Sequence, residues 1–502
     1  MRGAAGAAGE AGLGNTGSSS SETSGGEAWV LRQERREERH TLRAVARRFA
    51  DRTMVERTAW EALSTSEQKE HFTSAFPRDD RFLACGMRSR RSDGAVGVRE
   101  PAANGVAGFS ELQSCGSVWA CPVCAAKIMR RRSLELGQVL TWARGQLHTI
   151  AMVTLTVRHQ KSDRLRDVWD AVSTGWAAVT SGSAWVSEPE EKYQERRDRW
   201  DERRQLALEG KGRFPNGGRA NTPPVRRVGD QERFGILGWA RAVEVTTGAN
   251  GWHVHVHAVL VLKGTRADAE RNAFLAGTRM WDRWAAGLAK KGFDGLRDSG
   301  GLDVTVSRAA EKKLAEYLAK DGLTDDDATT IRESYGKKSR DVSMEATHGQ
   351  AKQAKKAGGR TPFQVLAALG QEVTDEQLRR RDVAIWREWV RGSEGRRQLT
   401  WSAGLREMAG LAEAELTDEE LAAVDEGGQT VLILPPATWQ AVKHWQTVVL
   451  DVIEMHGVDG LRAFLLEQGL AFEDPPTVAQ SVWFEEDIEP CPENWTGSRF
   501  VQ

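Results

Sequence analysis

The chain has 502 residues, of which 40% are hydrophobic and 28% are charged, and its formal net charge is −1. A chain of this length supplies enough apolar residues for more than one domain core. It holds no apolar run of about 18 residues or more, and Glu10 and several glycines interrupt the N-terminal stretch. These features argue against a membrane protein and against a secretory signal peptide, so we expect a cytoplasmic protein of bacterial style.

Composition and periodicity divide the chain into five segments. In chain order they are a disordered low-complexity stretch (1–28), an N-terminal helical and cysteine-rich region (29–126), a central α+β core (127–325) with a charged insertion (187–230), a basic extension (326–406) and an acidic C-terminal region (407–502). From residue 400 on, 4 basic residues stand against 19 acidic ones, whereas the rest of the chain has 66 against 52. A basic body attracts phosphates, so this pattern indicates a nucleic-acid partner.

Four of the five cysteines lie in the N-terminal region. Cys121 and Cys124 form a Cys-x-x-Cys turn that contains a proline, Cys115 precedes it by six residues, and Cys85 is a natural fourth thiolate. Four thiolates make a closed tetrahedral site for structural Zn²⁺. The alternative is a group of reduced, buried cysteines, but the proline-containing turn favours zinc. Cys491, between two prolines near the C-terminus, is unrelated to this cluster.

Three histidines mark a strand in the central core. His253, His255 and His257 alternate with valines, so their imidazoles share one face of a β-strand while the valines pack on the other. Imidazole is a common metal ligand, and residues on one face of a strand can converge on one ion. The alternative is a surface strand with solvated histidines. The regular spacing favours a metal site.

A second strand, Arg241–Thr247, precedes the histidines, and Gly248-Ala-Asn-Gly251 is a hairpin signal. If Ala249 and Asn250 form the turn, Glu244 faces His255; if the turn lies one residue later, Glu244 faces His257. Either two-residue turn puts Glu244 on the histidine face, with His253 as an alternative third ligand. A carboxylate beside imidazoles suits Mn²⁺ or Mg²⁺.

A helix rich in alanine, leucine, glutamate and lysine is predicted for Ser307–Lys320. It carries Tyr317, with Lys313 and Lys320 on the same helical face. Two ammonium groups beside a phenol favour the phenolate and can hold a phosphate, which suits covalent attack on a phosphodiester. Alone, this pattern also describes an ordinary amphipathic helix with a half-buried tyrosine.

In combination, these motifs carry a resemblance over about residues 80–406. A strand at 152–159, the pair His255-Val-His257 and Tyr317-x-x-Lys320 follow one another in that order, and 358–366 and 395–406 add further likeness. The chain resembles the rolling-circle replication initiators of the HUH endonuclease superfamily, in the branch found on actinobacterial plasmids. The cysteine cluster is also similar to that of these initiators.

The resemblance implies a fold and a reaction. The fold is α+β, with helices packed on an antiparallel sheet, a small cysteine-rich zinc region before it and a mainly helical acidic domain after it. Tyr317 attacks a phosphate of origin DNA, which leaves a 5′-phosphotyrosine and a free 3′-hydroxyl primer, while the histidines and a third ligand hold the catalytic Mn²⁺ or Mg²⁺. The partners are origin DNA, duplex and single-stranded, and a host helicase and polymerase.

One departure from the family pattern leaves a role open. Some relatives carry a glutamate four residues before the tyrosine, as the base for termination, and this chain has Lys313 there. Glu316 is near, but it lies about 100° around the helix from Tyr317. Tyr335, in a basic loop, is the second candidate nucleophile, whereas Tyr193 belongs to a charged helical insertion.

Two other functions are compatible with parts of this pattern. The first is a relaxase or single-strand transposase of the same superfamily, against which the cysteine cluster and the lack of an evident helicase motif argue. The second is a zinc-containing DNA-binding regulator without catalysis, which leaves the histidine strand and Tyr317 unexplained.

Overall fold

The structure, a computed structural model of the chain, describes residues 22–50, 79–102, 105–214, 222–264, 266–306, 359–371, 375–412 and 414–476. The first helix, α1 (Glu22–Ala50), begins inside the stretch predicted to be low-complexity, and residues 1–21 lie outside the described residues. The predicted helix Ser307–Lys320 and Cys491 also lie outside them. Among the described residues, no helix has both the length and the apolar character of a membrane-spanning segment.

The central element is a five-stranded sheet in which every pair of neighbours is antiparallel. The strand order is β6-β3-β5-β4-β7. The strands are β3 (Thr149–Thr156), β4 (Ile236–Gly248), β5 (Gly251–Leu262), β6 (Leu302–Val306) and β7 (Leu399–Trp401). The predicted antiparallel sheet is confirmed, and the structure adds β7 at its edge from the segment that the sequence assigned to the basic extension.

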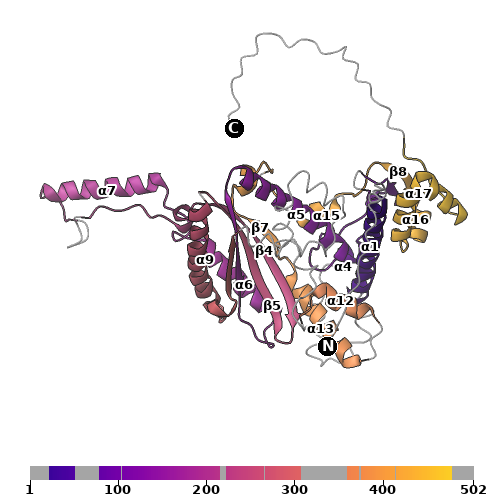
Figure 1. The fold of residues 1–502 in the computed structure, drawn as a ribbon, viewed down its shortest axis with the longest axis horizontal. Helices are drawn as coiled ribbons and strands as arrows, with labels where there is room; N and C mark the ends of the chain where they lie inside the picture. The colour runs from indigo at the N-terminus through magenta and orange to yellow at the C-terminus, as the bar shows by residue number, and fades with distance from the viewer. Residues whose placement is uncertain are drawn as a thin grey trace, which may run out of the picture.

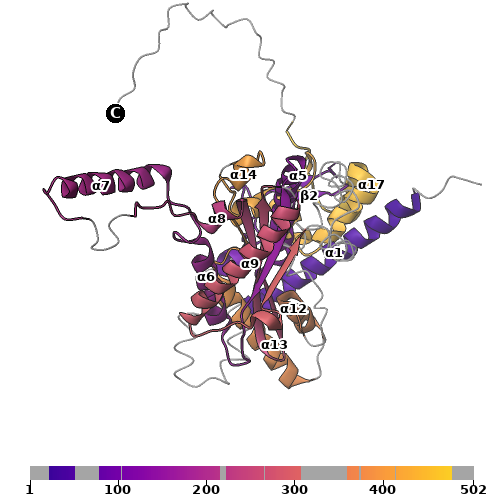
Figure 2. The same cartoon turned by 60° about the vertical axis from the view of Figure 1, so that its left-hand side comes forward.

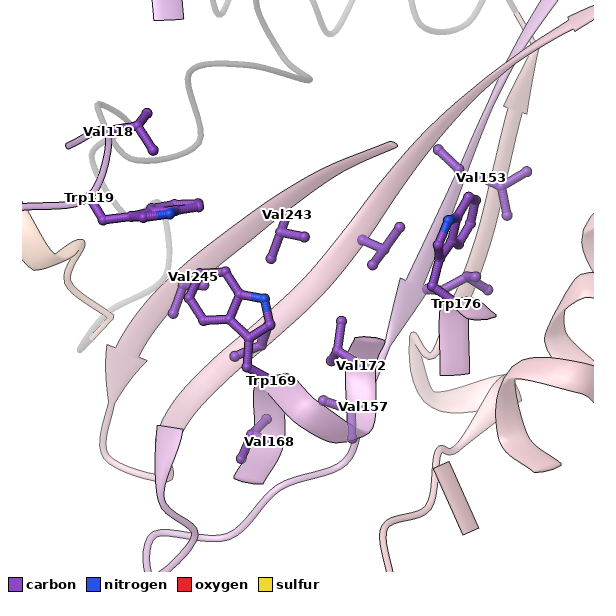
Figure 3. Packing of buried hydrophobic residues seen from close by; sticks show 14 of the residues in the cluster. Val118, Trp119, Val153, Val157, Val168, Trp169, Val172, Trp176, Val243 and Val245 are labelled. Carbon is purple, nitrogen blue, oxygen red and sulfur yellow. The ribbon is translucent and has the colours of Figure 1, made fainter. Parts of the chain in front are cut away.

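One face of this sheet is covered by α6 (Leu165–Thr180) and α9 (Arg266–Ala289) (Figure 1). Apolar side chains recur on α6 at helical spacing and form one buried stripe, namely Leu165, Val168, Trp169, Val172, Trp176 and Val179. Figure 3 shows Trp169 and Trp176 from this stripe beside the inward-facing valines of β3 and β4. The two helices approach closely, because a Cβ at Gly287 would lie only 2.7 Å from the Cα of Gly175.

The other face of the sheet is covered at one end by α5 (Pro122–Gly145) and the short α14 (Leu405–Met408). Their apolar residues enclose Val259 and Val261 of β5. The three histidines lie on the same face as these two valines, nearer the hairpin tip, and are not part of this cluster. The candidate site is therefore at the end of the sheet where this second apolar layer stops.

A second sheet joins an early segment of the chain to a late one. Its order is β2-β1-β8, with β1 (Val96–Arg99) between β2 (Gly108–Ser110) and β8 (Thr430–Leu434). The N-terminal cysteine-rich region and the acidic C-terminal region therefore share one hydrogen-bonded sheet and one apolar cluster. The remaining helices here are α4 (Asp79–Ala84), α15 (Asp418–Ala423), α16 (Pro436–Val442) and α17 (Gln446–Glu467).

A buried arginine reinforces this junction. Arg36 of α1 contacts Asp451, at 3.0 Å, and Glu454 of α17, and the side chains of Arg36 and Glu454 are 6% and 1% exposed. The Glu454 carboxylate also accepts a hydrogen bond from the backbone N–H of Ala107, 2.7 Å away. The acidic region is thus held to the N-terminal helix by a charge-assisted contact that is largely shielded from water.

The remaining elements attach to this body. The helices α12 (Pro362–Gly370) and α13 (Glu376–Ser393) follow one another, and α13 packs against α6. The short α8 (Asp230–Arg233) leads into β4, and a 3-10 helix (Arg297–Ser299) precedes β6. The helix α7 (Glu190–Leu208) projects from the body in both views (Figures 1 and 2).

Replacing Arg36 with alanine is expected to lower the free energy of unfolding by about 3 kcal/mol, because removing one partner leaves buried carboxylates without their cation. Urea denaturation of the full chain measures the change. Glu37→Ala removes an exposed charge from the next position of α1 and serves as the control. Equal unfolding midpoints for the two variants would show that the contact does not hold the acidic region.

Candidate active site

The hairpin of β4 and β5 places the acidic residue and the histidines on one surface. In the observed register Glu244 pairs with His255, Ala242 with His257 and Thr246 with His253. Gly248 pairs with Gly251, so Ala249 and Asn250 form the turn, which is the first of the two registers that the sequence allowed. Because directly paired residues point to the same side of a sheet, Glu244 and the imidazoles share a face.

The glycine after the turn has a structural reason. Gly251 has a φ of 87°, in the left-handed region that favours glycine. A Cβ at this position would also lie 2.9 Å from the carbonyl oxygen of Gln160. The loop after β3 therefore closes over the hairpin tip, which fixes the end of the hairpin that carries the histidines.

Glu244, His255 and His257 converge on one point. The Oε2 atom of Glu244 lies 3.2 Å from Nε2 of His255 and 3.1 Å from Nε2 of His257. The side chains of Glu244, His255 and His257 are 12%, 12% and 9% exposed, so the group is largely buried. Two ligands that bind an ion at right angles, each at about 2.1 Å, lie about 3.0 Å apart. The two distances from the carboxylate oxygen fit neighbouring positions around Mn²⁺ or Mg²⁺, and the three ligand atoms lie within 4.8 Å of one another.

The orientation of the His257 ring is fixed from the neighbouring strand. Thr154 of β3 pairs with His257, and its Oγ1 lies 3.1 Å from Nδ1 of that ring. When the Nδ1–H donates to the threonine oxygen, Nε2 keeps its lone pair for a metal. His255 differs, because its Nδ1 is buried without a hydrogen-bond partner among the described residues, so the polar contact of this ring is the one that Nε2 makes with Glu244.

His253 turns toward a different neighbour. Its Nδ1 lies 3.2 Å from Nε2 of His159, whose Nδ1 is 2.9 Å from the carbonyl oxygen of Asn250. Among the described residues, the group of possible ligands on this face consists of Glu244, His255 and His257, without His253. Of the two candidates for the third ligand, the structure brings Glu244 to the site.

The predicted nucleophile, Tyr317, and its neighbours Lys313 and Lys320 lie outside the described residues, as do Glu316 and Tyr335. The described segment that precedes them ends at Val306, the last residue of β6. This strand lies beside β3, and Asp303 of β6 and His257 of β5 both pair with Thr154. The chain that continues toward the predicted helix therefore starts one strand away from β5.

The four N-terminal cysteines also converge. The Sγ atom of Cys85 lies 3.8 Å from that of Cys121 and 3.5 Å from that of Cys124, and Cys115 is 3.6 Å from Cys124. Four thiolates about 2.3 Å from a tetrahedral Zn²⁺ are about 3.8 Å apart, so the spacing fits this ion. The helices hold the cluster, because Cys85 directly follows α4, and Cys121 and Cys124 lie at the start of α5.

The four thiols of the cluster differ in how readily they ionise: contact with Cys121 raises the pKa of Cys115, and burial raises the pKa of Cys121. Hydrogen bonds from Cys115, Cys121 and Cys124 hold the pKa of the Cys85 thiol far below its usual range. Arg47 donates to the backbone carbonyl of Cys85, and burial lowers the pKa of its guanidinium to about 10, which leaves it protonated at neutral pH. A buried cation beside the cluster would offset part of the negative charge that four thiolates bring to a zinc ion.

Comparison with known proteins gives a relative. No family model and no solved structure matches the chain. Over 350 residues the chain is 31% identical to a protein named Rep from Streptomyces lividans, an alignment that covers 63% of this chain and 69% of the relative. The chain belongs to the family of this Rep protein. It is also 34% identical, over 172 residues, to a neomycin resistance protein from Streptomyces cyanogenus, a match that covers 32% of each chain.

The structure adds two residues to the candidate site of this Rep-family chain that the sequence did not predict there. Thr154 and His159 both lie in the stretch 152–159, which sequence reasoning singled out only as a strand. The pairing of Thr154 with His257 could be read only once β3 was known to lie beside β5. The contact of His159 with His253 depends on the loop closing over the hairpin tip, which leaves no periodic signal in the sequence.

A graded series on the histidine face is expected to separate a metal ligand from a residue that positions one. Glu244→Ala should weaken Mn²⁺ binding most, and Thr154→Val should weaken it by about 10-fold to 100-fold, because the His257 ring loses its hydrogen bond. Thr154→Ser keeps the hydroxyl and should bind like the unaltered chain. Calorimetric titration with Mn²⁺ measures the affinities. Equal binding by all four proteins would exclude this face as the metal site.

Purification without chelator should yield the Rep-family chain with about one Zn²⁺ per molecule, because the four-thiol site is closed. Cys121→Ser should lose the ion and unfold at a lower temperature, since zinc binding contributes to folding. Cys491→Ser makes the same chemical change elsewhere and should alter neither. Elemental analysis and thermal denaturation give the readouts, and an unaltered chain that contains no zinc would refute the site.

Proposed function

We propose that this chain is a plasmid replication initiator that starts rolling-circle replication by cutting one strand of origin DNA with a tyrosine nucleophile. The observation that carries the proposal is the convergence of Glu244, His255 and His257 on the surface of an antiparallel sheet. The name of the Streptomyces lividans relative supports replication as the process. The arrangement of a His-hydrophobic-His strand beside a carboxylate supports an HUH-type endonuclease as the enzyme.

The residues divide the chemistry between them. Glu244, His255 and His257 would hold Mn²⁺ or Mg²⁺, and His253 lies next to them. This ion, when bound, polarises the scissile phosphate and offsets the charge that develops on its oxygens. Thr154 keeps the His257 ring in the orientation that presents Nε2 to the site. Each of the three side chains keeps 9% to 12% of its surface exposed, and a phosphate would approach from that side.

The strand transfer is an exchange of one phosphodiester bond for another. The phenolate oxygen of Tyr317 attacks the phosphorus, the bond from phosphorus to the 3′-oxygen breaks, and the leaving oxygen takes a proton to become a 3′-hydroxyl. The products are a 5′-phosphotyrosine and a primer end. Lys313 and Lys320, from the same predicted helix, would favour the phenolate and hold the phosphate. Because position 313 is a lysine, the base for termination is a separate residue.

The cysteine cluster has a structural part in this proposal. Cys85, Cys115, Cys121 and Cys124 would hold a Zn²⁺ ion that ties α4 to the start of α5, the helix that covers the sheet next to the histidines. The partners that follow from the function are plasmid origin DNA, duplex and single-stranded, and a host helicase and polymerase that act from the primer end, in the cytoplasm.

The relaxase and transposase alternatives share the chemistry, and the name of the relative favours replication. A regulator without catalysis would not require Glu244 to face two histidines whose nitrogens share one carboxylate oxygen. A nicking assay on supercoiled plasmid distinguishes the regulator from the enzymes.

Tyr317→Phe is expected to abolish nicking of supercoiled origin plasmid and the covalent protein–DNA adduct, with at least a 100-fold loss as the detectable change. Duplex binding should stay within about 2-fold, because the phenol oxygen is the nucleophile and not a phosphate ligand. The measurement is gel analysis of nicked plasmid with Mn²⁺ or Mg²⁺. Tyr335→Phe is the matched control and should nick normally. Adducts that persist in Tyr317→Phe and disappear in Tyr335→Phe would assign the nucleophile to Tyr335.

A further inference from the structure

The helix α7 stands away from the body of the protein (Figures 1 and 2). Its base is nevertheless well held, because the outgoing and returning segments are hydrogen-bonded to each other. The backbone N–H of Glu188 donates to Arg227 and that of Asp230 to Ala184, both at 2.9 Å. Asp230, 1% exposed, also pairs with Arg279 and Arg283 of α9. The arm is thus anchored to the core and directed outward.

Burial of apolar surface does not explain this arm. Of the 19 residues of α7, Trp200 alone is buried. Its ring is covered by the guanidinium groups of Arg197 and Arg204, whose Cζ atoms lie 5.9 Å and 5.5 Å from the ring centroid. A helix that is polar all round and isolated from a core needs another reason to exist, such as a partner on its surface.

The charges of α7 are sorted onto two faces. It holds six basic and six acidic residues, so its net charge is zero. With about 100° of rotation per residue, the basic residues and both aromatic rings fall within about 160° of the circumference, and the acidic residues fall on the remainder without overlap. The basic–aromatic face consists of Lys192, Tyr193, Arg196, Arg197, Arg199, Trp200, Arg203 and Arg204. The acidic face consists of Glu190, Glu191, Glu195, Asp198, Asp201 and Glu202.

This sorting leaves the outer part of the basic–aromatic face without carboxylate partners. Among the described residues, one ion pair forms within α7, between Arg197 and Asp201 at 3.2 Å. Arg199 and Arg203 donate through Nε to backbone carbonyls of their own helix, at 3.1 Å and 3.0 Å, and are exposed. Opposite charges do occur at spacings of three and four residues, as in Glu195 and Arg199, but the Nε of Arg199 donates to the backbone carbonyl of Glu195 and not to its carboxylate. Here the cations stay available to an external anion.

We propose that the basic–aromatic face of α7 binds the phosphate backbone of duplex DNA, independently of base sequence. The helix is about 28 Å long, which matches about eight base pairs of duplex. Guanidinium groups recognise phosphates, and the acidic face repels them, so only one side of the arm can dock. The inference rests on the proposed function for its choice of DNA as the polyanion, and it adds a contact that lies outside the metal site.

The arginines that carry the proposal are exposed and can be changed without disturbing the core. The first variant combines Arg199→Gln, Arg203→Gln and Arg204→Gln. The second exchanges two adjacent pairs, with Asp198→Arg, Arg199→Asp, Glu202→Arg and Arg203→Glu. The exchange keeps the composition, length and net charge of the full chain, and it alters only the sorting of charge onto faces. Circular dichroism and the melting temperature check that both variants fold.

The measurement is the binding of full-length protein to a duplex oligonucleotide without origin sequence, by fluorescence anisotropy across a series of salt concentrations. Each lost phosphate contact lowers the slope of log affinity against log salt by about 0.9, so the glutamine variant should lower it by about 2 to 3. The exchange variant should lower it by about 2, because it moves two cations to the far face. Unchanged slopes and affinities in both folded variants would overturn the proposal, as would a loss in the glutamine variant alone.

Nicking distinguishes a failure of this inference from a failure of the proposed function. If the exchange variant binds duplex DNA normally while Tyr317-dependent nicking is present, the arm is not a DNA contact and the enzyme assignment stands. If the slopes fall as expected but the unaltered chain does not nick plasmid with either Mn²⁺ or Mg²⁺, the arm binds DNA and the enzyme assignment is wrong. Tyr317→Phe is the reference for the second case, since it leaves α7 intact.

Discussion

The antiparallel pairing of β4 with β5 fixes the side on which each residue of the candidate active site lies. A shift of one residue in this register would send Glu244 to the face that packs on α6 and α9, where a carboxylate would be buried among valines and tryptophans. The closing of the hairpin at Gly251, under the loop after β3, prevents that shift. The turn conformation therefore sets the register, and the register brings Glu244 to His255 and His257, which follow it by 11 and 13 residues in the sequence.

The second constraint is the junction between the N-terminal region and the acidic C-terminal region. The sequence suggests an acidic region appended to a basic body, but Thr430–Leu434 forms the third strand of the N-terminal sheet. Arg36 reaches Asp451 and Glu454 across the same junction. Asp451 and Glu454 are therefore paired with a cation inside the protein and do not add their full charge to its surface. The cysteine cluster lies at the start of α5, beside Arg47 of α1, so a zinc ion there would stiffen the support of the sheet face that carries the histidines.

Local patterns account for what could be predicted. The alternation of histidine with valine and the glycines at 248 and 251 were enough to predict the hairpin, and cysteine spacing was enough to bring four thiols together. The choice between two registers was out of reach, because both two-residue turns give the same parity and keep Glu244 on the histidine face. Strands β7 and β8 were out of reach for another reason. They are 3 and 5 residues long and pair with segments more than 150 residues earlier, so no local period marks them.

The proposed metal ligands lie on strands and the proposed DNA-binding charges on a projecting helix, and these two placements suit two different requirements. A metal centre needs its ligand atoms held within a few tenths of an ångström, which paired strands with packed neighbours provide. Phosphate binding by exposed arginines tolerates looser geometry, because Coulomb attraction falls slowly with distance and the guanidinium groups adapt. The arm that carries α7 is anchored at its base, where Asp230 pairs with two arginines of α9. The polar helix can therefore extend from the body without apolar contacts of its own to the core. The same core helix, α9, thereby supports the sheet on one side and the arm on the other.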